Sequence, residues 1–163
     1  MLNLLTRKMI EYYSGDPKRI QHFIKVHSFA ALIGKSEGLR EKELFTLEAA
    51  ALVHDIGIKQ AERLYNECGG KLQEKLGPPE AREMLTTLGF EQDVTDRVCH
   101  MVSRHHTYTD IDGRDLQILI EADFLVNLYE DNTSRDGIIS AYSKIFRTES
   151  GKLLCREMFG IDE

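Results

Sequence analysis

Two aspartates that interrupt apolar helical sequence are the first residues that could do chemistry. Asp55 follows His54 directly after the run Ala49–Val53, and Asp123 lies within the apolar segment Leu119–Val126. A carboxylate in such surroundings is costly unless it is paired, hydrogen-bonded or bound to a metal ion. Imidazole and carboxylate groups together hold zinc, iron, manganese or nickel in proteins. The sequence therefore offers candidate metal ligands on separate helices of a bundle.

The elements that must position these residues have helical periodicity, and no alternating run of β-branched residues competes with it. Asp16-Pro17 predicts a helix start, with an N-cap followed by proline at the first helical position, and this helix should end near Gly38. A second helix is expected from about Glu41 to His54-Asp55, with Gly57 as its stop. The histidine-aspartate pair is thus predicted at a helix end.

Residues 59–76 are less regular and contain a loop at Gly69-Gly70. Further helices are predicted over residues 77–89, 91–106, 115–129, 134–146 and 150–159, with a turn at 110–113. We expect an all-α fold, a single compact multi-helix bundle that covers residues 1–163, with its C-terminal helices over about 134–160.

Composition limits the classes of partner. The chain has 163 residues, with 27 acidic and 21 basic side chains and a net charge of −6, which argues against binding a nucleic acid polymer. Three scattered cysteines indicate free thiols in a reducing compartment. The N-terminus does not resemble a signal peptide, and no apolar run reaches the ~18 residues of a membrane span. We therefore expect a cytoplasmic protein that does not bind membranes. The C-terminal helices could cover the core or a second copy in a homodimer.

The order of a histidine, a His-Asp pair and a later aspartate resembles the HD-domain superfamily of metal-dependent phosphohydrolases. The segment Ala49–Gly57 is very close to the AALLHDIG string of that family, and the resemblance covers about residues 19–127. His22 and His27 compete for the first position. The family's pattern R-I-x-H is matched at Arg19–His22, and His27 lies on another helix face, so we choose His22.

The resemblance implies a divalent transition metal, one of Mn, Fe, Co, Ni or Zn, held by His22, His54, Asp55 and Asp123. Asp55 is also expected to be catalytic. Binuclear members use further histidines, and His105 and His106 are expected to line a weaker second site or to contact the substrate phosphate as catalytic groups.

The chain departs from those binuclear members in one place. Where they have a histidine beside a Gly-Pro helix start, this chain has Leu76-Gly77-Pro78; Glu74 and Glu80 are acidic residues nearby that could replace it. Lys59 and Arg104 are the candidates for binding substrate. Asn127, one turn beyond Asp123, could orient that carboxylate.

The function implied by the resemblance is hydrolysis of a phosphate monoester, either a nucleotide or another small phosphorylated metabolite. Two alternatives use the same scaffold. One is an HD-type di-iron oxygenase that cleaves C–C or C–P bonds with O₂, and the other is a non-catalytic module that binds a nucleotide or metal and regulates a partner. Two irons per chain with substrate-dependent O₂ uptake would favour the oxygenase, and tight ligand binding without any product would favour the module.

Overall fold

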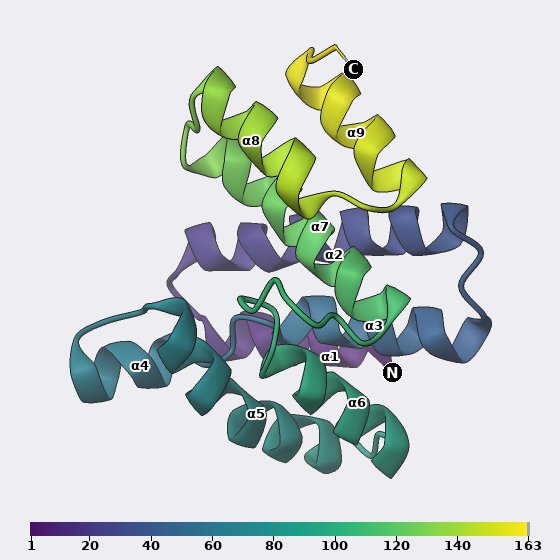
Figure 1. Cartoon of the computed structure of the whole chain (residues 1–163). Helices are drawn as coiled ribbons and strands as arrows, with labels where there is room; N and C mark the ends of the chain where they lie inside the picture. The colour runs from purple at the N-terminus through teal and green to yellow at the C-terminus, as the bar shows by residue number, and fades with distance from the viewer. Residues whose placement is uncertain (163) are drawn as a thin grey trace.

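The computed structural model describes residues 1–162, and all of its regular elements are helices (Figure 1). They are α1 (Leu2–Tyr12), α2 (Pro17–Ser36), α3 (Glu41–Val53), α4 (Ile58–Tyr65), α5 (Gly70–Thr87), α6 (Gln92–Val102), α7 (Arg114–Glu130), α8 (Arg135–Ile145) and α9 (Glu149–Phe159). The predicted all-α bundle is confirmed. Within residues 1–162, none of these helices has both the length and the apolar character needed to cross a bilayer.

Helix α3 lies at the centre of the bundle. Its last five residues, Ala49–Val53, are buried, and it packs against α1, α2, α6 and α7. A helix that is apolar on all sides belongs in a core, and the small alanines allow its neighbours to approach closely. In Figure 1, α7 crosses α2 and reaches α3. The end of α3, where His54 and Asp55 lie, is consequently inside the protein.

The start of α2 follows from local sequence, as predicted. The Asp16 side chain accepts a hydrogen bond from the Arg19 N–H at 3.1 Å, and Pro17 occupies the first helical position. Since Pro17 has no N–H to satisfy, the two residues together fix where the helix begins. This start places His22 in the second turn of α2.

The predicted boundaries of residues 59–89 are wrong. Helix α4 covers much of the stretch expected to be irregular, and α5 begins at Gly70, so that Pro78 and Pro79 lie inside it. Proline removes an N–H from the helix ladder and normally ends a helix. Here tertiary packing outweighs that cost, because α5 crosses the chain at Gly57 so closely that a Cβ there would lie 2.7 Å from the backbone nitrogen of Gly77.

Helix α1 was not predicted. Its isolated sequence is only briefly apolar, but Leu5 and Met9 are fully buried, and Tyr13, directly after the helix, is 4% exposed. Helix α1 packs on α3. Short helices owe most of their stability to such packing rather than to propensity, which explains why the local sequence gave too little signal.

A buried carboxylate ties α9 to α7. Glu121 of α7 is fully buried and accepts hydrogen bonds from the N–H groups of Arg147 and Thr148, at 2.6 and 2.9 Å, beside the start of α9. A negative charge at a helix N-terminus is favourable because the N–H groups there are unpaired. Helix α7 thus anchors α9 with Glu121, while Asp123 lies two residues further along the same helix.

Candidate metal centre

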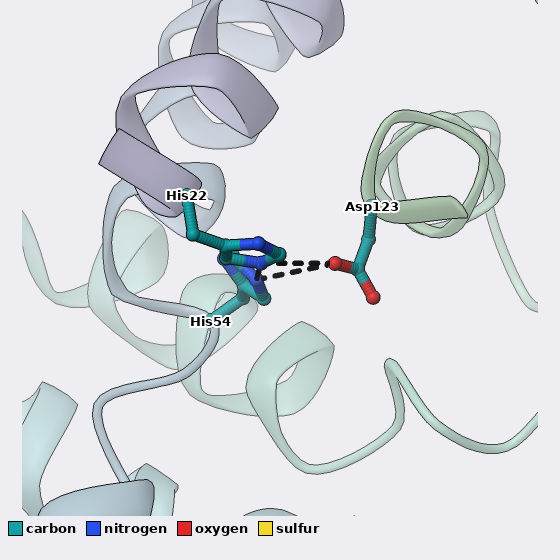
Figure 2. A group of neighbouring side chains, drawn as sticks. All are labelled: His22, His54 and Asp123. Atoms are coloured by element: carbon teal, nitrogen blue, oxygen red, sulfur yellow. Dashed lines mark hydrogen bonds and ion pairs between the residues drawn. The ribbon is translucent and has the colours of Figure 1, made fainter. Parts of the chain in front are cut away.

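Four side chains meet where α2, the end of α3 and α7 approach one another. His22 comes from α2, His54 and Asp55 directly follow α3, and Asp123 comes from α7. The Nε2 atoms of His22 and His54 are 3.2 Å apart, and Asp123 Oδ1 lies 3.2 Å from the former and 3.5 Å from the latter. Figure 2 shows both imidazoles turned toward Asp123. We call His22, His54 and Asp123 the first ligand group.

Hydrogen bonds on the far side of each imidazole turn Nε2 toward this centre. His54 Nδ1 lies 2.8 Å from the carbonyl oxygen of Ala51, and His22 Nδ1 lies 2.9 Å from Glu130 Oε2. Because carbonyl and carboxylate oxygens only accept, each Nδ1 donates and each Nε2 is left facing the other. Such a pair of nitrogens beside a carboxylate can share a proton or bind a metal cation.

Asp55 connects this first group to a second one. Its Oδ2 atom lies 3.4 Å from His22 Nε2 and 3.5 Å from His54 Nε2, while its Oδ1 atom lies 3.5 Å from His105 Nε2. We call Asp55, His105 and His106 the second ligand group. Within each group the candidate ligand atoms lie within 4.8 Å of one another. Asp55 therefore presents one oxygen to each group.

The end of α6 differs from its prediction, and the difference positions His105. The helix ends at Val102 instead of continuing through residue 106. In a continuing helix the Val102 carbonyl would accept the His106 N–H. It accepts His105 Nδ1–H at 2.8 Å, and the His106 N–H donates to Glu74 Oε1 at 3.0 Å. His105 is 1% exposed, and its Nε2 atom has no hydrogen-bond partner among residues 1–162. A buried nitrogen in this state is suited to a metal ion.

His106 is oriented differently from the other three imidazoles of the centre. The Gln73 amide nitrogen donates to the Cys68 carbonyl at 2.7 Å, so its oxygen faces His106 Nε2 at 3.0 Å. That nitrogen must then donate to Gln73. Burial, and secondarily the neighbouring His105, lowers the pKa of His106 to about 4. His106 is thus a neutral imidazole whose Nε2 is already used.

In the first group, the neighbouring charges raise the pKa of His54, whereas the pKa of His106 is lowered. Burial alone would lower the pKa of His54, but the carboxylates of Asp55 and Asp123 outweigh burial and raise that pKa to about 9. Burial likewise would raise the pKa of Asp123, yet hydrogen bonds from His22 and His54 hold it below its usual range. The first group therefore stabilises a positive charge at its centre, whether a proton or a cation.

A cavity of about 370 Å³ gives access to the centre from outside. Four of the residues that line it belong to the two ligand groups: His22, Asp55, His106 and Asp123. The others come from the start of α2 (Asp16, Lys18 and Arg19), from α4 to α5 (Ile58, Cys68 and Gln73) and from the end of α7 (Asn127, Glu130 and Asp131). The ligands are therefore buried at the base of an open site, as a site that accepts a substrate requires.

Two cations expected to bind substrate have other partners. Lys59 Nζ donates to the Tyr12 carbonyl at 2.6 Å and lies 4.6 Å from the centre of the Tyr12 ring. Arg104 donates to the carbonyls of Thr109 and Asp110 at 3.0 and 3.2 Å. Neither is among the residues that line the cavity. The structure does not bring Lys59 or Arg104 together with the ligand groups.

The structure also shows where His27, the competitor of His22, and Asn127, the expected partner of Asp123, lie. His27 Nε2 lies 3.0 Å from Glu48 Oε1, so the structure brings His22, and not His27, to the centre. Asn127 Nδ2 donates to Asp123 Oδ1 at 2.9 Å, as its spacing suggested. Glu80 is hydrogen-bonded to Tyr12 and Gln60.

The cavity residues that sequence reasoning missed include Lys18, Arg19, Gln73, Glu130 and Asp131. Arg19 and Lys18 precede His22 by three and four residues, which puts all three on one side of α2. That spacing is the signal that could have found them. Glu130 follows Asn127 by three residues and could have been found in the same way. Gln73 gave no such signal, because its position depends on where α5 begins.

Histidines and aspartates gathered at the base of an open cavity define a helical protein with a candidate metal-dependent active site. The HD domain family matches residues 19–143, and the chain belongs to that family. The search of curated proteins gave no match. Among solved structures, a predicted HD superfamily hydrolase from an uncultured Thermotogales bacterium is similar in fold, with 24% identity and a TM-score of 0.70. The comparison covers 98% of this chain and 85% of that one.

Proposed function

We propose that the chain is a metal-dependent phosphohydrolase that hydrolyses a phosphate monoester of a small metabolite. The observation behind the proposal is the cavity, which joins the ligands Asp55 and Asp123 at its base to Lys18 and Arg19 on its wall. A divalent cation together with basic side chains suits a phosphate group. Membership of the HD domain family and a structural relative named as a predicted hydrolase support the reaction class.

The chain's residues fit a divalent transition-metal ion. His22, His54, Asp55 and Asp123 would hold it, and Nε2 of buried His105, which has no hydrogen-bond partner among residues 1–162, is a further donor on the second side of Asp55. This set of nitrogen and oxygen donors suits Mn, Fe, Co, Ni or Zn. When bound, such an ion supplies a lowered pKa for water and neutralises charge on phosphate oxygens.

The surrounding residues have separate parts in this proposal. Glu130 and Asn127 fix the orientation of His22 and Asp123 through hydrogen bonds of 2.9 Å each. Lys18 and Arg19 attract the phosphate to the cavity. His106 is neutral because its pKa is lowered to about 4, and since its Nε2–H donates to Gln73, its Nδ1 atom is left as an acceptor or ligand nitrogen and not as an acid. In the overall reaction, water adds to phosphorus and the P–O bond to the alcohol breaks.

One observation favours a second candidate function, the di-iron oxygenase. Because Asp55 offers one oxygen to each ligand group, a second ion could share it with His105 and His106. His106 Nε2–H donates to the Gln73 amide oxygen, which leaves Nδ1 as the nitrogen through which His106 could bind that ion. Hydrolysis remains our proposal because the family match and the named hydrolase relative support that reaction class.

The test is the metal content of protein purified without a metal-scavenging tag, followed by assay of p-nitrophenyl phosphate hydrolysis. We expect at least one ion per chain, and Asp55→Ala should lose the metal and more than about 100-fold of the activity. Asp162→Ala, at an exposed aspartate after α9, is the matched control. Two irons with substrate-dependent O₂ uptake would replace the proposal with an oxygenase. Protein that binds no metal after incubation with each of the five ions would refute both and favour a binding module.

A further inference from the structure

The cavity wall beyond the ligand groups carries opposite charges on its two sides. Lys18 and Arg19 lie in the first turn of α2, where the helix dipole is positive, and Glu130 and Asp131 lie at the end of α7, where it is negative. Asn127 lies one turn before Asp131 on the same helix. A substrate that extends from the ligand groups toward solvent therefore meets hydrogen-bond donors on one side and acceptors on the other.

Several polar atoms of this wall are available to a substrate. Within residues 1–162, neither the Lys18 amino group nor the Asp131 carboxylate has a hydrogen bond or an ion pair. Asn127 donates its amide N–H to Asp123, which leaves its amide oxygen as an acceptor. Arg19 and Glu130 differ, because Asp16 and Glu62 bind the former while His22 and Lys25 bind the latter. The free groups are thus one donor, Lys18, and two acceptors, Asn127 and Asp131.

Hydroxyl groups match this mixture best, because each hydroxyl both donates and accepts. Two side chains of the wall are of apolar type, Ile58, which is only 8% exposed, and the exposed Cys68, and none is aromatic apart from the imidazoles of the ligand groups. The Tyr13 ring is buried and does not line the cavity, and its hydroxyl donates to the Asp55 carbonyl at 2.7 Å. The cavity's 370 Å³ is near the lower end of the roughly 300–1,000 Å³ usual for ligand pockets, which indicates a small substrate.

We propose that the substrate is the monophosphate of a small polyhydroxylated compound, a sugar phosphate, and not a nucleotide. This inference rests on the proposed phosphohydrolase function and narrows its substrate class. The phosphate lies at the ligand groups, and the hydroxyls of the sugar lie between Lys18 on one side and Asn127 and Asp131 on the other. Water adds to phosphorus, the ester P–O bond breaks with its electrons going to the sugar oxygen, and a proton from the water completes that hydroxyl. The products are the free sugar and inorganic phosphate.

The test compares two esters of the same hydroxyl, ribose 5-phosphate and adenosine 5′-monophosphate, with the metal-loaded protein. They differ at one carbon, which carries a hydroxyl in the first and adenine in the second. We expect kcat/KM to be at least about tenfold higher for ribose 5-phosphate, the effect of one or two well-placed hydrogen bonds.

Assay of p-nitrophenyl phosphate distinguishes failure of the sugar phosphate proposal from failure of the phosphohydrolase proposal. Hydrolysis of that ester with adenosine 5′-monophosphate equal to or better than ribose 5-phosphate would overturn the sugar phosphate alone. Hydrolysis of none of the three would overturn the phosphohydrolase function as well.

Substitution of Asp131, which lines the cavity wall, tests the same inference from the side of the protein. Asp131→Ala should raise KM for ribose 5-phosphate about fivefold to tenfold with a smaller change in kcat, because a hydrogen bond to a charged acceptor is lost. Asp131→Asn keeps an acceptor oxygen of the same shape and should recover part of that loss. Glu157→Ala, which removes an exposed carboxylate from α9, is the matched control. An unchanged KM in a folded Asp131→Ala protein would overturn the proposed contact.

Discussion

The two ligand groups are built from different kinds of structure. His22 and Asp123 of the first group lie within long helices, and each is held by a side chain from α7, Glu130 or Asn127. The two histidines of the second group lie in the turn after α6 and depend on hydrogen bonds to the Val102 carbonyl and to the Gln73 side chain. Ligands on rigid, packed elements need little rearrangement to bind an ion. We therefore expect the first group to bind its ion more tightly than the second.

Removal of one histidine from each group is the strongest way to break this comparison. His54 and His105 are matched, since both are buried and both donate Nδ1–H to a carbonyl three residues earlier. His54→Ala should weaken binding of the first ion by more than about 100-fold, whereas His105→Ala should leave one ion bound per chain. Elemental analysis and titration of the metal-stripped protein measure both. Equal losses in the two variants would show that the groups act as one site.

Removal of Glu130, which supports His22, should weaken metal binding less than removal of His54. Glu130→Ala removes the acceptor that orients His22 and should weaken the first ion's binding by about 10- to 100-fold, the usual cost of losing such a partner. Lys25→Ala is the matched control, because it removes the other partner of Glu130 but leaves the bond to His22. Its effect on metal affinity should be much smaller. If the two variants weaken binding equally, the charge network and not the His22 orientation is responsible.

The two groups should also respond to pH in opposite directions in metal-stripped protein. The pKa of His54 is raised from 6.5 to about 9, so its contribution to stability is complete below pH 6.5 and is lost as the pH rises through 9. The pKa of His106 is lowered to about 4, so its contribution is present above pH 6.5 and is lost as the pH falls through 4. Urea unfolding of wild type, His54→Ala and His106→Ala across this range measures each difference. A wild-type advantage over His54→Ala that grew between pH 6.5 and 9 would contradict the assignment.

The smallest predicted effect concerns the backbone of Asp55. Tyr13→Phe removes the hydroxyl that donates to the Asp55 carbonyl at 2.7 Å and should lower the free energy of unfolding by about 0.5–1.5 kcal/mol. Tyr12→Phe is the control, because the hydrogen bond from the Tyr12 hydroxyl to the Ile56 carbonyl is longer, 3.3 Å, and the Tyr12 side chain is only partly buried. Denaturant unfolding measures both. A loss in Tyr12→Phe as large as that in Tyr13→Phe would show that the bond to the Asp55 carbonyl has no special weight in supporting the turn.

Local signals explain the parts of the fold that the sequence predicted. The start of α2 depends on Asp16 and Pro17, which act on their own helix, and the last five residues of α3, Ala49–Val53, are apolar on every side because they lie in the core. The start of α5 could not be predicted in this way. Its first two turns are held by packing at Gly57 and Gly77, which lie 20 positions apart. Contacts between distant segments leave no periodic pattern in either one.

The residues of the site likewise fall into those that sequence patterns predicted and those that they did not. His22, His54, Asp55 and Asp123 were predicted as ligands, and the structure brings their side chains together. Lys59 and Arg104 were chosen because they are close in sequence to the motifs, but a cation next to a motif in sequence can point elsewhere in space. Lys18 and Arg19 share a helix side with His22, so helical spacing was the better guide to the cavity wall.

The hydrogen bond from His105 to Val102 gives one side chain a part both in the metal centre and in the end of a helix. Three donors at this end bond carbonyls outside the α-helical ladder: the Arg104 N–H bonds Met101, the Ser103 hydroxyl bonds His100, and His105 Nδ1–H bonds Val102. A residue at position 105 without that donor removes one of the three groups that favour the turn over a further turn of helix. Substitution at this position is therefore limited by folding as well as by binding.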